Sequence, residues 1–171
     1  SLEELARIVR HGVDVALHVE GVALLVRDPT VGRFVDPLGE LRPLDAGARL
    51  ATLVQSHHQP MAVDLEAPGS PFQNLSESDQ YWLIGGQVAM PAPVFALEGS
   101  MIGLLALGRK RSELAFLKED RELLRGVCSN ISLVIELLFL KERTPTPRGR
   151  TAESDEGSLF PPSVLADGTA S

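Results

Sequence analysis

The sequence contains one cysteine, Cys128, in 171 residues. A lone cysteine excludes a disulfide framework within the chain, and it excludes a zinc site built from several cysteine thiolates. Such sparing use of cysteine is typical of proteins in a reducing compartment, so we expect a cytoplasmic location. The chain also opens without the charged and apolar segments of a signal peptide, which agrees with that expectation.

Two further features are missing, an excess of positive charge and a long apolar run. Sixteen Lys and Arg residues stand against 23 Asp and Glu, which gives a net charge of -7. Because nucleic acids are bound through basic side chains, we expect no nucleic-acid partner. The longest apolar runs, 88–97 and 131–140, are shorter than a membrane-spanning helix, so we expect no membrane partner. What remains is the composition of a globular domain, with 44% apolar and 23% charged residues.

Recognisable catalytic motifs are absent as well. The sequence has no phosphate-binding glycine loop, no dinucleotide fingerprint, no nucleophile elbow and no zinc-protease signature. His57 and His58 are adjacent at the end of a predicted helix, so their rings point apart and cannot share one metal ion. We therefore predict no catalytic residue and no metal site, and the sequence identifies no cofactor. A small enzyme is the least favoured alternative.

Hydrophobic spacing predicts helices at the two ends of a domain. Ser1 and Glu4 fit a capping box, and apolar residues at helical intervals follow to about residue 17. A final helix is expected from Phe116 to about Arg143, with acidic residues in its first turn and basic residues in its last. A shorter helix is expected at 46–57.

Strands are predicted between these helices. The segments "GVALLVRD" and "RFVDP" should pair as an antiparallel hairpin, and "PMAVDL", residues 60–65, reads as a short strand. A longer hairpin is expected from "VAMPAPVFALEGSMIGLLALGRK", residues 88–110, with its turn at 98–100. Pro91 and Pro93 have no N–H to donate, so we expect them at a sheet edge or a bulge.

The composition changes along the chain in two places. Residues 66–87 form an irregular connection rich in Pro and Gly, with a short helical segment near "SESDQYWLI" capped by Ser76 or Ser78. Connections of this length are usually functional. After residue 143 the sequence is rich in Pro, Ser, Gly and acidic residues. We therefore expect a domain at 1–143, followed at 144–171 by a linker or tail without a core of its own.

Three short segments resemble the GAF domain family. Pro93-Val94 matches the Pro-apolar pair of its penultimate strand, and Ile102-Gly103-Leu104-Leu105 matches its last strand. Phe116, Glu119 and Asp120 match the opening of its final helix. The resemblance covers about residues 1–143, and the last forty or so carry its specific part. Leu117 departs from the pattern, because the family usually has a capping Thr or Ser there, so we expect a weaker cap at a cost of about 1 kcal/mol.

The resemblance implies an α/β fold of the α+β type, as in GAF and PAS domains. It implies a central antiparallel sheet of about five or six strands, with the N- and C-terminal helices packed on one face. Irregular connections and short helices would lie on the other face. It also implies a regulatory sensory domain of a larger signalling protein of bacterial type. The effector, a kinase, phosphatase or cyclase, would lie in the same polypeptide.

The family resemblance places an unknown small molecule between the sheet and the irregular connections. Aromatic residues are scarce, 5% in all, yet three of them fall in this segment and offer an apolar pocket. The same rings would otherwise fill the cavity as core, which would leave a purely structural dimerisation module. The sequence lacks the Asn-Lys-Phe-Asp-Glu pattern of cyclic-nucleotide-binding members and the several cysteines of methionine sulfoxide reductases. The candidate pocket residues are His57, Phe72, Tyr81, Trp82, Met90 and Phe95.

The final helix predicts a partner for the domain. Between residues 131 and 140 only Ser132 and Glu136 interrupt the apolar residues, and one face packed on a sheet cannot bury them all. An inward stripe is expected at Ile131, Val134, Ile135 and Leu138. The remainder would form an adhesive patch. We therefore predict a homodimer with isologous contacts through Leu133, Leu137, Phe139 and Leu140.

Two other features have both a structural and a functional interpretation. Cys128 falls among apolar residues of the final helix, which favours packing over reactivity. The basic run Arg109, Lys110 and Arg111 ends a predicted strand. We expect these cations to pair with acidic residues at the start of the final helix, and a phosphate site is the alternative.

Overall fold

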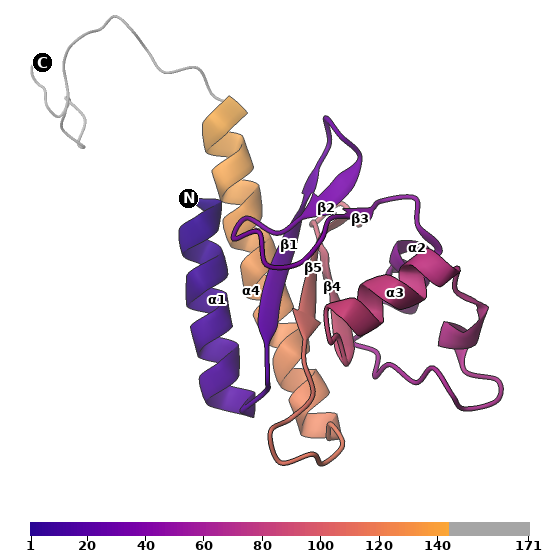
Figure 1. The fold of residues 1–171 in the computed structure, drawn as a ribbon. Helices are drawn as coiled ribbons and strands as arrows, with labels where there is room; N and C mark the ends of the chain where they lie inside the picture. Colours follow the sequence, from indigo (N-terminus) through magenta and orange to yellow (C-terminus); the bar gives the residue numbers. More distant parts are fainter. Residues whose placement is uncertain (144–171) are drawn as a thin grey trace, which may run out of the picture. The chain divides into compact units, whose positions relative to one another are not determined.

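The computed structural model describes residues 1–143, and the predicted tail at 144–171 lies outside these described residues. In chain order the elements are α1 (Leu2–Leu17), β1 (Val22–Asp28), β2 (Arg33–Val35), β3 (Leu44–Asp45), α2 (Arg49–His57), η1 (Pro71–Asn74), α3 (Glu77–Gly85), β4 (Met90–Phe95), β5 (Met101–Leu107) and α4 (Lys118–Arg143). The five strands form one antiparallel sheet in the order β3-β2-β1-β5-β4. Helices α1 and α4 cover one face, and α2 and α3 cover the other (Figure 1). This arrangement confirms the predicted α+β class.

The side of the sheet that faces α1 and α4 buries one stripe from each helix. α1 begins with the predicted capping box, in which the Ser1 hydroxyl accepts from the Glu4 N–H at 3.2 Å. On β5, Gly103 fits tightly between the neighbouring strands, because a Cβ there would lie 3.1 Å from the Leu25 carbonyl oxygen and 3.3 Å from Val94 Cβ. The buried helix residues are Leu5, Ala6, Val9, Val13 and Leu17 of α1 with Leu124, Cys128, Ile131, Ser132 and Ile135 of α4.

The opposite side of the sheet holds a large hydrophobic cluster. Leu25 and Leu104, which pair across β1 and β5, belong to it. Their neighbours Leu24 and Leu105 point to the α1 and α4 side, since side chains alternate along a strand. The cluster also contains Leu50 and Val54 of α2, Phe72 of η1, and Trp82 and Leu83 of α3. The irregular connection therefore packs as a second core layer.

β4 is an edge strand, as its two prolines predict. The segment at 60–65 runs beside it, where the Met61 N–H donates to the Pro91 carbonyl at 3.1 Å and the Val63 N–H donates to the Ala89 carbonyl at 2.8 Å. The prediction of a regular strand at 60–65 is wrong, because Pro91 has no N–H with which to complete the ladder. A register shift follows between Val94 and Phe95.

The ends and polar positions of α4 are tied to the sheet. The Leu117 N–H donates to the Asp120 carboxylate at 2.7 Å, which supplies one half of a capping box although the capping hydroxyl is missing. Further along, the Ser132 hydroxyl donates to the Phe95 carbonyl, and Glu136 accepts from the Leu97 N–H at 3.2 Å. The two polar residues inside the apolar run therefore bond the backbone at the end of β4.

α4 is also the one helix in the described part of the chain that is long and apolar enough, over Lys118–Glu142, to cross a membrane. Counting uninterrupted apolar runs did not indicate this, because charged residues such as Arg125 and Glu136 interrupt the runs in this helix. In the described structure, however, Leu124, Ile131 and Ile135 of this helix are buried in the core of the domain. The compact unit comprises Ser1–Leu138.

Candidate functional site

The aromatic residues proposed as pocket lining are placed in two different ways. Phe72 is buried in the hydrophobic cluster at 1% exposure, and Trp82 is buried at 9%. The Trp82 indole N–H donates to the Arg42 carbonyl at 2.7 Å, so its polar atom is satisfied within the chain. Tyr81, the next residue to Trp82 on α3, is 69% exposed. The two buried rings thus pack as core, and the tyrosine points to solvent.

The other three candidate pocket residues are placed differently, and of these only Phe95 packs against the cluster that contains Phe72 and Trp82. Met90 is fully buried, but it pairs with Leu107 and lies on the α1 and α4 side of the sheet. His57 is exposed at the last residue of α2. Phe95 is half-buried at the end of β4 and stacks on His58, with ring centroids 4.8 Å apart. The structure therefore does not bring the six residues together.

A cleft of about 270 Å³ lies on the irregular side, next to the end of α3. We call it the α3 cleft. At its polar end Arg109 and Glu20 form an ion pair, with Nε and Oε1 3.2 Å apart. Gln87, with a φ of 52°, follows the end of α3 and also lines the cleft. The apolar wall consists of Val63, Leu65, Leu83, Ile84, Val88 and Ala89, none of which the sequence marked as site residues.

Two buried carboxylates hold the irregular connections around this side. Asp36 accepts from the backbone N–H groups of Leu38, Glu40 and Leu41, each at 2.9 Å. Asp79 of α3 accepts from the Leu50 N–H at 3.0 Å. Because α2 has no side-chain cap of its own, Asp79 satisfies one of its free N–H groups from a different helix. These carboxylates act as structural acceptors.

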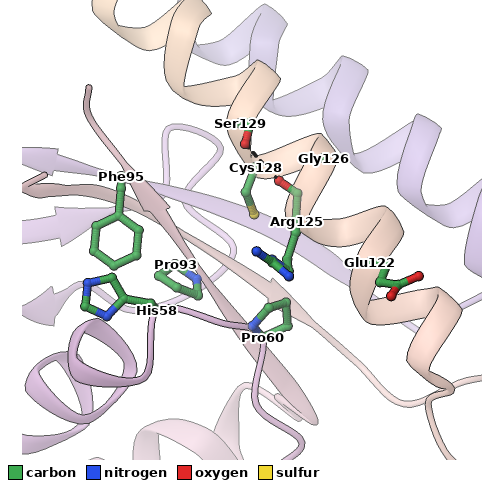
Figure 2. A pocket seen from close by; sticks show the side chains of 9 residues that line it. All are labelled: His58, Pro60, Pro93, Phe95, Glu122, Arg125, Gly126, Cys128 and Ser129. Carbon is green, nitrogen blue, oxygen red and sulfur yellow. Dashed lines mark hydrogen bonds between the residues drawn. The ribbon is translucent and has the colours of Figure 1, made fainter. Parts of the chain in front are cut away.

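A second cleft, of about 340 Å³, lies at the outer edge of β4, and we call it the edge cleft (Figure 2). It is bounded by the segment after α2, by the second half of β4, and by one side of α4. Burial raises the pKa of the Cys128 thiol in its wall to about 12, so the thiol stays protonated at neutral pH. The lining residues are His58, Pro60, Pro93, Phe95, Glu122, Arg125, Gly126, Cys128 and Ser129.

The basic run after β5 is fully paired. Arg109 contacts Glu20, Lys110 contacts Asp120 at 2.8 Å, and Arg111 contacts Asp14 at 2.9 Å. The Lys110 and Asp120 side chains are mostly buried. Burial acts to raise the pKa of Asp120, but the bonds from the Leu117 N–H and Lys110 outweigh it and lower the pKa. The three cations thus neutralise acids, which disfavours a phosphate site.

The outward side of α4 carries large exposed apolar residues. Leu133 is 59% exposed and Leu137 is 65% exposed, one helical turn apart. Val134 was expected in the buried stripe, but it is 40% exposed because it lies on the flank of the helix, away from Ile131 and Ile135. Phe139 and Leu140 belong to the last turns of α4. α1 adds two exposed residues at helical spacing, Ile8 and Val15.

Among the described residues no group of three or more His, Cys, Asp or Glu side chains is placed to hold a metal ion.

Comparisons with known proteins locate the fold through structure alone. No family model matches the chain, and no curated protein matches it in sequence. Solved structures do match. Residues 122 to 287 of a methyl-accepting chemotaxis protein superpose with a TM-score of 0.66 at 18% identity, covering 84% of this chain and 94% of that one.

Two GAF domain structures agree with this result. The GAF domain/HD domain protein from Geobacter sulfurreducens gives a TM-score of 0.63 at 15% identity, over 82% of this chain and 95% of that one. The GAF domain of a phosphoenolpyruvate-protein phosphotransferase from Coxiella burnetii gives 0.63 at 17% identity, over 84% and 88%. The chain has a GAF-like fold.

Proposed function

We propose that this chain is a regulatory sensory domain that acts as a homodimer joined through α1 and α4. Support comes from the fold, which it shares with domains of a chemotaxis protein and a phosphotransferase. The single observation that carries the proposal is the exposed apolar face of α4. In this proposal a small molecule or protein bound on the irregular side changes how the terminal helices pack, and the helices pass that change to an effector.

A second copy of the chain fits the apolar face of α4 better than a partner of different chemistry. Leu133 and Leu137 stand one turn apart, with Val134 on the flank of the same surface. Burying one such side chain contributes about 1.5–3 kcal/mol, so leaving several in water is costly. The apolar side chains of this face offer nothing to select a charged partner, but they complement their own copy across a twofold axis. Helix pairs commonly use this spacing.

The α3 cleft supports a ligand on the irregular side. Its volume of about 270 Å³ is close to the lower end of ligand pockets, and it combines an apolar wall with a polar end. The alternative is a structural dimerisation module. The burial of Phe72 and Trp82 within the core favours that alternative, because the rings that were expected to line a pocket fill space.

Sedimentation of the 171-residue chain tests the dimer. We expect a species of about twice the 18.4 kDa of one chain, and we expect the Leu133→Glu/Leu137→Glu variant to sediment as a monomer with an unchanged far-UV spectrum. A matched control, Leu97→Glu/Leu114→Glu, adds the same charge at exposed leucines outside the helices and should remain dimeric. A wild-type monomer at high concentration would sink the proposal.

Ligand screening separates the sensor from the structural module. Saturating ligand raises the melting temperature by linkage, so we expect a rise with a molecule that occupies the α3 cleft. Replacing Leu83 is unsuitable because it is part of the core, whereas Ile84→Gln changes an exposed part of the wall and should weaken that rise. A screen without any hit, on a chain shown to be dimeric, favours the structural module.

A further inference from the structure

The edge cleft lies beside the apolar face of α4, since Ser129 in its wall is one helical turn before Leu133, on a part of the sheet edge that no strand covers. The segment at 60–65 covers the first half of β4, where the Met61 N–H donates to the Pro91 carbonyl. The residues that precede Pro60 do not run along β4. The Ser132 bond to the Phe95 carbonyl closes the far end. Between these two points the cleft of about 340 Å³ is open to solvent.

Arg125 is the cation of this cleft. Figure 2 shows its guanidinium directed over Pro60 and Pro93, whereas the Glu122 carboxylate points away. In an acidic chain, six basic side chains are paired with carboxylates within residues 1–143, but no carboxylate there pairs with Arg125. Its Nη groups are therefore available for the bidentate bonds that arginine forms with a carboxylate.

The remaining walls are flat and apolar, with one backbone acceptor. The stacked rings of His58 and Phe95, 18° from parallel, form a rigid side wall, and the rings of Pro60 and Pro93 lie beside it (Figure 2). The Pro91 carbonyl points outward to Met61. By the alternation of a strand, the carbonyl of Pro93, two residues further, points to the same outer side.

We infer that the edge cleft binds a small monocarboxylate with a flat apolar body and an N–H donor. Arg125 would hold the carboxylate, the rings and prolines would cover the body, and the Pro93 carbonyl would accept from the N–H. The volume limits the ligand to a small one. Glu122 at the mouth disfavours ligands with several negative charges. The inference does not depend on the dimer.

N-acetylphenylalanine is a suitable probe, because it carries the ring, the amide N–H and the carboxylate together. Titration of the isotope-labelled 171-residue chain, followed by NMR, should shift the amide signals of Gly126 and Ser129 and the ring signals of His58 in a saturable manner. The uncharged analogue N-acetylphenylalanine amide should bind at least about tenfold more weakly, the loss of one charged bond of about 1.4 kcal/mol. A Leu133→Gln/Leu137→Gln variant, which removes the apolar face without adding a carboxylate one turn from Ser129, should bind as the wild type does.

Variants of the arginine complete the test. Arg125→Gln should weaken the probe at least about tenfold, and Arg125→Lys should give an intermediate loss, because it keeps the charge without the fork of donors. Arg7→Gln on α1 also removes an exposed arginine, one that lies outside the edge cleft, and it should leave binding unchanged. The inference is overturned by an absence of saturable shifts, by shifts confined to the α3 cleft, or by equal binding to the Arg125→Gln variant.

Discussion

The two sides of the sheet bury their residues to different extents. On the α2 and α3 side, Phe34, Phe72 and Leu50 are almost fully buried, and even the backbone N–H groups of the connections find carboxylate acceptors. On the α1 and α4 side, each helix buries one stripe and leaves large apolar residues such as Leu137 and Ile8 in water. The α2 and α3 side exposes fewer large apolar residues, Tyr81 and Ile84 of α3, so we call it the closed side and the α1 and α4 side the open side.

This difference indicates how the domain divides its tasks. On the closed side the rings of Phe72 and Trp82 are packed in the core. A ligand on that side would therefore bind in the cleft at the end of α3, and not in a cavity between the rings. The open side exposes apolar surface that is energetically unfavourable in a monomer. A partner is therefore expected on the terminal helices, while the irregular side provides rigidity.

The largest expected effect concerns Cys128, which belongs to the open side but faces inward. With a pKa of about 12, about one thiol in 10⁴ is ionised at pH 8, compared with about one in four for an ordinary thiol. We expect iodoacetamide to react with the native chain about a thousandfold more slowly than with the chain unfolded in urea. Fast labelling of the native chain would show that α4 does not pack on the sheet as described.

The next effect tests the closed side directly. Phe72→Ala should lower the free energy of unfolding by about 3–5 kcal/mol, because it leaves a cavity where the ring was packed. Tyr81→Ala removes an exposed ring from the adjacent helix and should change the free energy of unfolding by less than about 0.5 kcal/mol. Urea unfolding followed by Trp82 fluorescence measures both, and equal losses would contradict the distinction between a packed and an exposed ring.

A smaller effect is expected at Asp79, the buried carboxylate that joins α3 to the start of α2. Asp79→Ala leaves the Leu50 N–H without its acceptor, and it should lower the free energy of unfolding by about 1–3 kcal/mol. Glu77→Ala, an exposed acid in the same first turn of α3, serves as the control and should have little effect. If hydrogen exchange at the Leu50 amide is equally slow in both variants, Asp79 does not cap α2.

The smallest effect lies at the junction between β5 and α4. The pKa of Asp120 is lowered from its ordinary value of 3.8, so its carboxylate stabilises the fold above that pH, and this contribution disappears as the pH falls below it. Asp120→Asn should therefore lower the free energy of unfolding by about 1 kcal/mol at pH 7 and make little difference near pH 2. Urea unfolding measures the difference, and an equal loss at pH 7 and near pH 2 would contradict the role of the Asp120 carboxylate.

The fold could be predicted largely from the sequence, because its evidence is local. Helical spacing and a capping box define α1, alternating β-type residues define β1 and β5, and the prolines of β4 require an edge. The segment at 60–65 was wrongly predicted as a strand. Its residues favour a strand, but Pro91 of the neighbouring β4 has no N–H to complete the pairing. The weak cap of α4 was predicted, but the contribution of Asp120 was not.

The candidate sites depended on contacts that no local pattern contains. By itself the sequence determined the order of elements, the apolar excess of the last helix and the absence of any catalytic motif. The tertiary structure alone decided that Phe72 and Trp82 are core and that Met90 lies on the far face. It also decided that Arg125 lines one cleft with Pro93, His58 and Phe95. The physical reason is that hydrophobicity determines which residues are buried but not which residues they pack against. A binding surface is made by residues that only chain folding brings together.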